Sequence, residues 1–306
     1  MRSDVDKSMK SGIVAVVGRP NVGKSTLVNA MVGEKILIVT DKPQTTRQRV
    51  RAVMNEPRGQ IVFVDTPGLH RPMHLLGSYL EKEVLDSFTG IDAVCYVAES
   101  SDRRVGRADR LVLRHVGDSG RPVILVLNKI DRLCGPDDFW PAVEAYSPFF
   151  TPRTVVPVSA ISGMNLDVLK EKLFDVLPEG PPVYEDDRLA DCTERFLAAE
   201  VIREQVLLAT EQEVPHSVAV TVDEFLSPDE YPERRNLSVR ATIIVERNGQ
   251  KGIIIGNRGA RLKSIGEQAR KELEDRFAFP VYLDLWVKVR PGWRNSRDSL
   301  RRLGYQ

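Results

Sequence analysis

Gly18-Arg19-Pro20-Asn21-Val22-Gly23-Lys24-Ser25 is the stretch that decides the fold of the first half of the chain. It follows an apolar run at Ile13–Val17 and opens a helical segment at Ser25–Met31. A G-x-x-x-x-G-K-[ST] loop in this context wraps backbone N–H groups around phosphate oxygens, next to a positive helix N-terminus. We therefore predict a nucleoside triphosphate site in which Lys24 reaches the β- and γ-phosphates and Ser25 binds Mg²⁺. The predicted contacts in this loop are Gly18, Arg19, Pro20, Asn21, Val22, Gly23, Lys24, Ser25 and Thr26.

Short apolar runs alternate with helix-length segments from Ile13 to about Leu177. The runs are nearly continuous in apolarity and rich in β-branched residues, which is typical of strands buried on both faces of a parallel sheet. The alternation predicts an α/β P-loop domain, with a mostly parallel sheet and helices on both faces. The predicted strands are Ile13–Val17, Arg51–Met54, Ile61–Val64, Ala93–Val97, Val123–Leu127 and Val155–Val158.

Two further motifs follow predicted strands and complete a metal and phosphate site. Asp65-Thr66-Pro67-Gly68 comes directly after Ile61–Val64, where the Asp65 carboxylate can hold Mg²⁺ directly or through water. Gly68 leaves room for its backbone N–H to approach the γ-phosphate. The polar stretch Gln44–Arg47 can close over the γ-phosphate and Mg²⁺ through a threonine hydroxyl.

Asn128-Lys129-Ile130-Asp131 ends the strand at Val123–Leu127 and selects the base. Guanine presents two adjacent donors, N1–H and an exocyclic amine, which the Asp131 carboxylate can accept together. Adenine would leave that carboxylate without partners. Lys129 can lie along the base, and the Ser159-Ala160 turn can contact guanine O6 or simply cap a helix. These motifs together predict a GTP-binding, GTP-hydrolysing protein.

The distribution of charge along the chain suggests a nucleic-acid partner. The region from Arg234 to Gln306 holds 17 Lys+Arg against 7 Asp+Glu, a net +10, whereas the whole chain carries only +1. This asymmetry suggests a polyanion-binding C-terminal part, although a solvated basic face would look the same. The three cysteines are dispersed and predict neither disulfides nor zinc, in keeping with a cytoplasmic protein. The polar N-terminus and the lack of long apolar runs indicate no membrane span.

A second, smaller α+β domain is predicted after the proline-rich stretch Pro178–Tyr184. A helix is predicted at Thr193–Thr210, followed by strands at Ser217–Phe225 and Leu237–Glu246 and by an Asn-Gly hairpin turn at 247–249. Helix Ala260–Phe277 and strand Val281–Val289 complete it. The predicted boundaries are 1–10 for a flexible N-terminus, 11–180 for the G domain, 181–192 for a linker, 193–295 for the second domain and 296–306 for a tail.

The loop Gly256-Asn257-Arg258-Gly259 enters the helix at Ala260–Phe277 and predicts RNA binding. A G-x-x-G loop between an isoleucine run and an amphipathic helix is similar to a KH domain, whose loop clamps about four nucleotides. We expect Trp293 to lie on the surface, where it could stack a base, and Trp286 to lie in the core. The predicted RNA contacts are Ile255, Gly256, Asn257, Arg258, Gly259, Arg261, Lys263 and Trp293.

The set GRPNVGKST, PQTTR, DTPGLH and NKID, followed by the G-x-x-G loop, resembles the Era family of ribosome-associated GTPases from about Ser11 to Trp293. The resemblance implies that Thr46 joins Ser25 and Asp65 as a Mg²⁺ ligand. It also implies binding to the 3′ end of 16S rRNA, a role in maturation of the 30S subunit, and a monomer with possible peripheral contact to the inner membrane. The family often has Lys-Gly inside the loop, where this chain has Asn257-Arg258.

Hydrolysis is the least determined step. Leu69 occupies the position where many GTPases place a water-orienting glutamine, and His70 follows it. The resemblance extends to GTPases that use K⁺ in place of an arginine finger and bind it through the asparagine that matches Asn21, which here could equally only shape the loop. We expect slow intrinsic hydrolysis, with Asn21, Lys24, Thr46 and Gly68 as the catalytic group.

Three other functions are weighed against this one. A purely RNA-binding protein with a degenerate nucleotide pocket is disfavoured by the intact Lys24, Ser25, Asp65 and Asp131. A membrane-surface or cell-cycle-linked regulatory GTPase, whose basic C-terminal domain contacts lipid, is disfavoured by the G-x-x-G loop. A P-loop kinase is disfavoured by the NKID motif.

Overall fold

The computed structural model describes residues 9–68, 73–135, 137–185 and 188–305. Its chain divides into two compact units. The first comprises the chain up to Leu37, Thr46–Met73 and Gly77–Asp191. The second comprises Ile38–Thr45, His74–Leu76 and the chain from Cys192 onward. Two short pieces of the N-terminal half therefore belong to the C-terminal unit.

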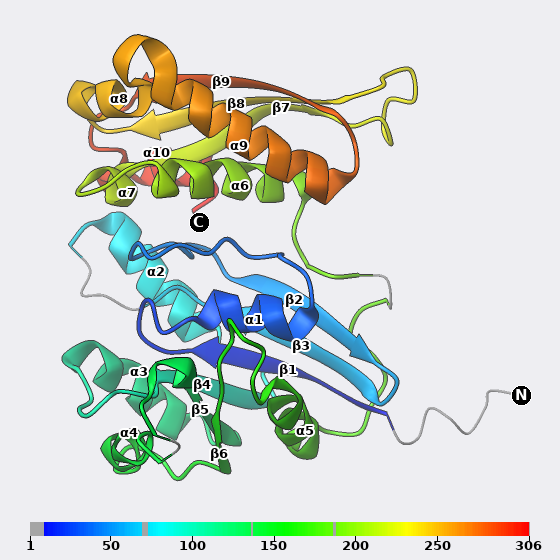
Figure 1. The fold of residues 1–306 in the computed structure, drawn as a ribbon, viewed down its shortest axis with the longest axis vertical. Coiled ribbons are helices and arrows are strands. Elements are labelled where there is room, and N and C mark those ends of the chain that lie inside the picture. The colour runs from blue at the N-terminus through cyan, green and yellow to red at the C-terminus, as the bar shows by residue number, and fades with distance from the viewer. Residues whose placement is uncertain (1–8, 69–72, 136, 186–187, 306) are drawn as a thin grey trace, which may run out of the picture. The chain divides into compact units, whose positions relative to one another are not determined.

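The first unit is built on a six-stranded sheet in the order β2-β3-β1-β4-β5-β6 (Figure 1). Strand β2 runs antiparallel to β3, and the other four pairings are parallel. Because the strand order reverses at β1, the loop after this strand lies where open α/β sheets bind ligands. The strands are β1 (Lys10–Val17), β2 (Val50–Glu56), β3 (Gly59–Asp65), β4 (Ala93–Glu99), β5 (Val123–Asn128) and β6 (Thr154–Pro157).

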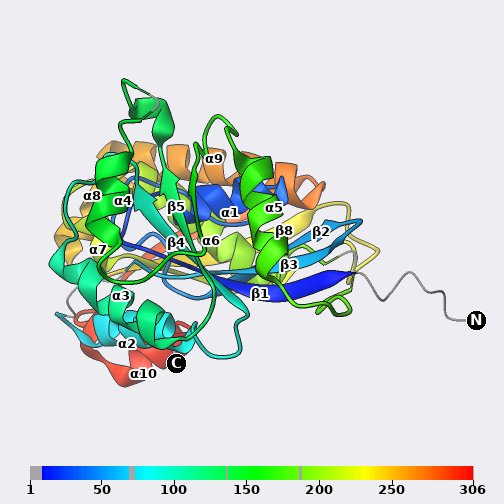
Figure 2. The same cartoon turned by 90° about the horizontal axis from the view of Figure 1, so that it is seen from below.

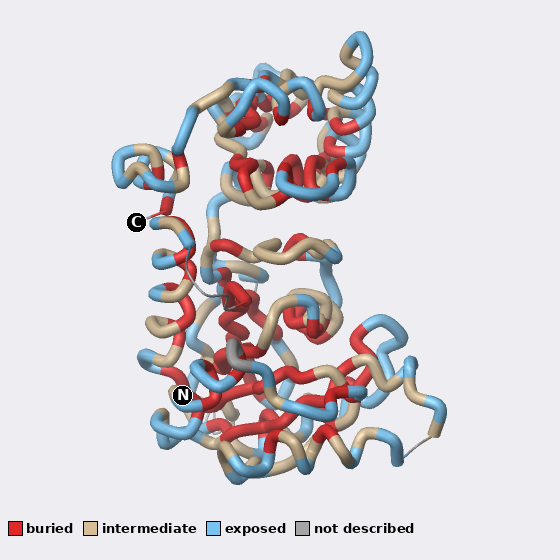
Figure 3. The backbone as a smooth tube through the Cα atoms, turned by 90° about the vertical axis from the view of Figure 1, so that its left-hand side faces the viewer, coloured by how far each residue is buried: buried red, intermediate tan, exposed pale blue. Residues whose placement is uncertain are grey.

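Helices cover both faces of this sheet, as Figure 2 shows. Helices α2, α3 and α4 pack their apolar side chains on one face against β1, β4 and β5, while α1 and α5 pack together on the other. The central strands are almost entirely buried (Figure 3), which explains their continuous apolarity. The helices are α1 (Lys24–Val32), α2 (Leu75–Asp86), α3 (Arg107–Asp118), α4 (Trp140–Tyr146) and α5 (Leu166–Val176). The predicted P-loop fold is confirmed.

The segment that follows α5 is held against the first unit. The Gln60 side chain accepts hydrogen bonds from the backbone N–H groups of Val183 (2.8 Å) and Tyr184 (2.9 Å). Further along, the Val53 N–H donates to the Leu189 carbonyl at 2.8 Å. The described residues of the stretch expected as a linker therefore lie along β2 and β3.

The second unit is a three-stranded sheet, in the order β7-β8-β9, with α6 and α9 packed on it. Strand β7 is antiparallel to β8, and β9 is parallel to it. Thr193 caps α6 by accepting a hydrogen bond from the Phe196 N–H at 3.2 Å. Its elements are α6 (Glu194–Leu208), α7 (Val214–Ser217), β7 (Ala219–Leu226), β8 (Leu237–Val245), α8 (Asn248–Ile255), α9 (Ala260–Phe277), β9 (Val281–Val289) and α10 (Arg297–Arg302).

Helix α8 replaces the hairpin turn predicted at residues 247–249, and that prediction is wrong. The Gln250 side-chain oxygen accepts from the N–H groups of Glu246 (3.0 Å) and Arg247 (3.1 Å), which caps the start of the helix. The isoleucine run then forms the last turn of α8, where Ile254 is fully buried and Ile253 is exposed. The Asn-Gly pair thus opens a helix because tertiary packing outweighs the local turn signal.

Residues 296–306, expected as a tail, include helix α10, and Leu300 and Tyr305 are buried.

Among the described residues, every helix is too short or too polar to cross a membrane.

Candidate nucleotide and RNA sites

The loop between β1 and α1 leaves no space at two of its glycines. Gly18 has φ +152°, and a Cβ on it would lie 2.2 Å from the Val97 carbonyl oxygen. Gly23 has φ +97°, and a Cβ there would lie 2.4 Å from the Asn128 amide nitrogen. Only glycine permits both the backbone conformation and the close approach. The sequence motif is therefore a steric requirement of the fold at this loop.

Lys24 lies inside this loop. Its ammonium donates to the carbonyl oxygens of Gly18 and Arg19, each at 3.0 Å, and the residue is 6% exposed. Burial lowers the Lys24 pKa to about 8, although the nearby Asp65 carboxylate acts in the opposite direction. A buried ammonium surrounded by curled backbone is suited to a polyanion such as a triphosphate.

Three oxygen atoms meet beside the loop. The Ser25 hydroxyl lies 2.7 Å from Asp65 Oδ2 and 3.0 Å from the Thr46 hydroxyl, which is itself 3.1 Å from the same carboxylate oxygen. Asp65 is fully buried, and its Oδ1 has no hydrogen-bond partner among the described residues. One carboxylate and two hydroxyls are the hard oxygen donors that Mg²⁺ takes, so the residues fit that ion.

The turn after β3 approaches the phosphate loop closely. Thr66 donates its hydroxyl hydrogen to the Val16 carbonyl at 2.9 Å, which fixes the turn to β1. A Cβ on Gly68 would lie 2.6 Å from Pro20 Cγ. Pro67 lies between these two residues. The predicted Leu69 and His70 lie outside the described residues.

Asn128 and Ser159 join the base-selecting segments. The Asn128 amide donates to the Val22 carbonyl at 2.8 Å and accepts from the Ala160 N–H at 3.0 Å. The Ser159 hydroxyl donates to Asp131 Oδ1 at 2.6 Å. The structure therefore brings the phosphate loop, the NKID segment and the Ser159-Ala160 turn together, as predicted for a guanine pocket.

Glu99 is a residue of this site that the sequence analysis missed. It ends β4 and forms ion pairs with Arg19 (3.3 Å) and Lys129 (3.3 Å). Arg19 also pairs with Asp102, which accepts a hydrogen bond from the Tyr146 hydroxyl at 2.9 Å. Glu99 lies at the carboxyl end of a parallel strand, where the other site residues also lie. This position was the signal in the sequence that could have identified Glu99 as a site residue.

The G-x-x-G loop of the second unit, predicted to bind RNA, lies between α8 and α9. Gly256 and Gly259 have φ +70° and +82°, and Arg258 is also left-handed at +49°. Asn257 and Arg258 are exposed, Lys263 is exposed on α9, and Ile255 is partly buried. Arg261 Nη1 donates to the Ile253 carbonyl at 2.6 Å, so Arg261 also braces the loop.

Comparison with known proteins identifies the chain. The family model described as a 50S ribosome-binding GTPase matches residues 13–129, and the KH domain model matches residues 213–294. A crystal structure of a variant of Era from Aquifex aeolicus bound to GDP·AlF4⁻ is 40% identical, with a TM-score of 0.92, over 97% of this chain and 99% of that one. The chain belongs to the Era family.

A second Era structure contains both a nucleotide and a ribosomal RNA fragment. Era in complex with MgGDPNP and nucleotides 1506–1542 of 16S ribosomal RNA is also 40% identical, with a TM-score of 0.91 and the same coverage. The family and fold predicted from the sequence are thus confirmed.

The two tryptophans contradict the sequence analysis. Trp293 is fully buried, donates its indole N–H to the Ser217 carbonyl at 2.9 Å and stacks on Tyr305. Trp286, which was expected in the core, is 57% exposed on β9. The alternation of β9 explains this, because Val281 and Val287 face the core and Trp286 faces the other side. Trp293 is therefore a packing residue, and the prediction that it contacts RNA is wrong.

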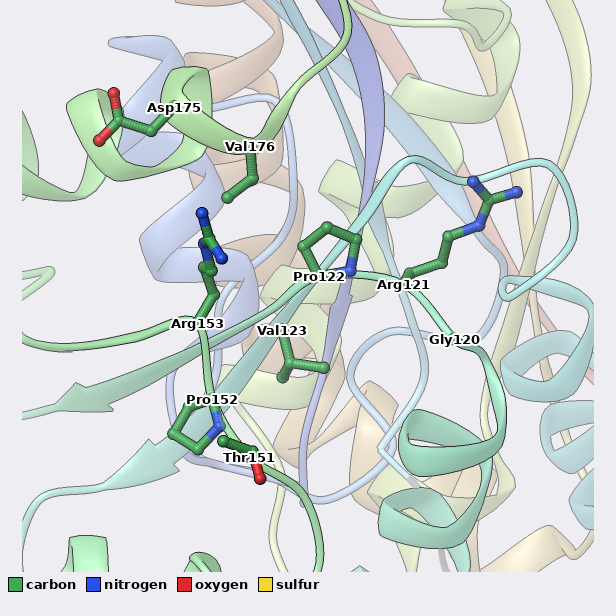
Figure 4. Close-up of a pocket in the computed structure, with 9 residues that line it drawn as sticks. All are labelled: Gly120, Arg121, Pro122, Val123, Thr151, Pro152, Arg153, Asp175 and Val176. Atoms are coloured by element: carbon green, nitrogen blue, oxygen red, sulfur yellow. The ribbon is translucent and has the colours of Figure 1, made fainter.

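A cavity of about 670 Å³ lies at the start of β5 (Figure 4). Strand β5 begins with Val123 at this cavity, whereas the NKID segment begins with Asn128 at the other end of the strand. Figure 4 shows Arg121 and Arg153 on opposite sides of Pro122. The cavity is therefore separate from the nucleotide site.

Proposed function

We propose that the protein binds GTP with Mg²⁺, hydrolyses it to GDP and phosphate, and binds the single-stranded 3′ end of 16S rRNA during maturation of the 30S subunit. One observation carries the proposal: Ser25, Thr46 and Asp65 converge beside a glycine-locked phosphate loop. The chain that does this is 40% identical, over nearly its whole length, to Era bound to MgGDPNP and 16S rRNA.

The residues divide the chemistry between them. Ser25, Thr46 and Asp65 would hold Mg²⁺, which neutralises charge on the β- and γ-phosphates when bound. Lys24 stabilises the negative charge that develops between those phosphates, and the Gly68 N–H approaches the γ-phosphate. Asp131 selects guanine. Because Leu69 cannot orient water, unassisted turnover is slow, on the order of 10⁻³ s⁻¹ or less.

GTP turnover by the purified protein tests the enzymatic half. We expect phosphate release from GTP in Mg²⁺, none from ATP, and none when Mg²⁺ is chelated. Ser25→Ala removes one metal-binding hydroxyl and should abolish turnover while leaving Asp131-dependent base selection intact. Equal turnover of ATP and GTP would contradict the assignment of the guanine pocket.

We also propose that K⁺ binds at Asn21 and supplies the charge of a missing arginine finger. Asn21 has φ +63°, a conformation that Asn and Asp both tolerate. Asn21→Asp should therefore leave the loop folded while changing the response to the ion. Turnover compared in KCl and NaCl at equal ionic strength decides the point, and equal rates in the unsubstituted protein would refute it.

The RNA half rests on the exposed loop residues Asn257 and Arg258 and on the basic charge that surrounds them. Crosslinking of the GTP-loaded protein to total cellular RNA should concentrate reads at the 3′ end of 16S rRNA. A control in which Arg258 and Lys263 are both alanine should lose these reads. Reads spread evenly over ribosomal RNA would contradict the proposed target.

Location, assembly and boundaries complete the proposal. We assign the protein to the cytoplasm, as a monomer whose only membrane contact is peripheral. Its cysteines Cys95, Cys134 and Cys192 are all free, which suits a reducing compartment. We propose 11–180 for the G domain and 193–295 for the KH domain. Light scattering of the purified protein tests the monomer.

A further inference from the structure

The segment Ile38–Thr45 lies just before the metal-site residue Thr46 and is part of the second unit. Ile38 is 5% exposed within the hydrophobic core that includes Val201 and Ile202 of α6. The next residue, Val39, donates its backbone N–H to Glu204 Oε1 at 2.8 Å. The start of this segment is therefore anchored on α6 by both apolar packing and a partly buried hydrogen bond.

The end of the same segment is anchored by the preceding residue of α6. Arg203 is 1% exposed, donates to the Thr45 carbonyl and pairs with Glu200. Its Nη1 has no partner among the described residues. A buried guanidinium is costly unless its bonds are made. The bonds of Arg203 to the Thr45 carbonyl and to Glu200 offset part of this cost.

The segment is held in a strained, compact form between these anchors. Gln44 has φ +62°, which is uncommon for a residue other than glycine and needs the surrounding structure to enforce it. The Thr45 hydroxyl donates to the Lys42 carbonyl at 2.7 Å and lies 2.6 Å from the Thr40 hydroxyl. Strain of this kind fixes the direction in which the chain enters Thr46.

We propose that Arg203 and Glu204 are positioning residues for GTP hydrolysis. By holding Ile38–Thr45 on α6, they fix the backbone that leads directly into Thr46, whose hydroxyl lies 3.1 Å from Asp65 Oδ2. This inference rests on the proposed GTPase function.

The test uses the full-length protein with Arg203→Met and Glu200→Gln together, so that no carboxylate loses its partner. Thr46 serves only the metal and the γ-phosphate, so GDP affinity should change by no more than about twofold. Affinity for MgGDPNP should fall about 5- to 150-fold, the usual range of coupling between sites, and the kcat for GTP should also fall. Hydrogen exchange should show lost protection of the Val39 amide.

Two further variants separate positioning from a general structural role. Arg195→Met lies on the same helix, where Arg195 is exposed and donates to the Val222 carbonyl, and should change none of these quantities. Ile38→Ala weakens the anchor without altering α6 and should lower MgGDPNP affinity in the same direction if the double variant does not fold. Arg203→Lys keeps a donor and should recover part of the loss.

The proposal is overturned if a folded Arg203/Glu200 variant retains the parent affinity for MgGDPNP and the parent kcat. It is equally overturned if the Val39 amide exchanges freely in the parent protein. A failure of the proposed GTPase function would give a different result, because the parent protein would then bind GTP no more tightly than ATP. In that case hydrogen exchange at Val39 would still decide whether α6 anchors the segment.

Discussion

Two glycine loops precede helices in this molecule, and they differ in how closely the surrounding atoms approach their last glycine. The loop before α1 is enclosed, with backbone or side-chain atoms 2.2–2.4 Å from where a Cβ of Gly18 or Gly23 would lie. The loop before α9 is crowded at Gly256, where a Cβ would lie 2.7 Å from the Arg261 Cβ, but open at Gly259, where no described atom lies within 4 Å. The first encloses a phosphate chain of fixed shape, while the second offers Arg258 to a flexible strand. Tolerance to substitution should differ accordingly.

Gly18→Ala should have the largest effect. The added methyl meets the Val97 backbone oxygen and the backbone is strained, so we expect GTP affinity to fall about 100-fold or more. Titration with a fluorescent GTP analogue measures this. The matched change Gly259→Ala should cost only about 1–2 kcal/mol of stability from its left-handed backbone and leave GTP affinity unchanged. Similar losses of GTP affinity in both variants would contradict the proposed difference between the two loops.

Asp131→Asn should exchange the base preference of the enclosed site. An amide cannot accept both guanine donors, so GTP affinity should fall about 10- to 100-fold while xanthosine triphosphate gains. The Ser159 hydroxyl can still donate to the new side chain, so the turn should stay folded. Competition binding with the two nucleotides gives the ratio, and an unchanged preference would remove Asp131 from base recognition.

The enclosed site should also respond to alkaline pH, because the Lys24 pKa is lowered by burial to about 8. Above pH 8 the empty protein loses this charge, which the phosphates restore on binding. GTP affinity should therefore fall up to about tenfold per pH unit above pH 8, until the pH reaches the higher Lys24 pKa of the complex. Between pH 8 and the ordinary lysine pKa of 10.5, the free energy of unfolding of the empty protein rises, since the unfolded chain binds more protons at Lys24.

Calorimetry at pH 8.5 in two buffers of different ionisation enthalpy should detect this proton uptake on GTP binding. Lys24→Met should bind weakly without it. Equal heats in both buffers for the parent protein would show that Lys24 stays charged.

Arg258→Ala should have the smallest effect, and it concerns the open loop. Removing one phosphate contact should lower RNA affinity a few-fold and reduce the salt slope by about 0.7. Lys271→Ala, an exposed cation further along α9, is the matched control and should change neither. Filter binding over a range of KCl measures both. An unaltered slope in the Arg258 variant would place the phosphate contacts elsewhere.

The sequence predicted the first unit better than the second. All six strands of the mostly parallel sheet and the three segments that meet at the nucleotide site follow from motifs and apolar runs, because each motif demands one backbone geometry. Helix α9 and strand β9 also have the predicted bounds. The local sequence pattern was sufficient to predict the structure wherever steric constraints allow only one backbone conformation.

The misses come from tertiary context. Ile253–Ile255 is a short apolar run that suits a strand or a buried helical turn, and only the Gln250 cap decides for the helix. Trp286 could have been placed by the period-two alternation from Val281, but its size argued for the core. The Arg203 contact with Thr45 joins residues far apart in sequence, which no motif signals.

The three cysteines have unequal chemistry. Cys95 is buried in β4, where burial raises its thiol pKa to about 12, so it is a poor nucleophile at neutral pH. Cys134 is exposed, three positions after the base-selecting Asp131. A maleimide dye should therefore modify Cys134 first in the unaltered protein. Guanine binding could then be followed by fluorescence at that position without introducing a new cysteine.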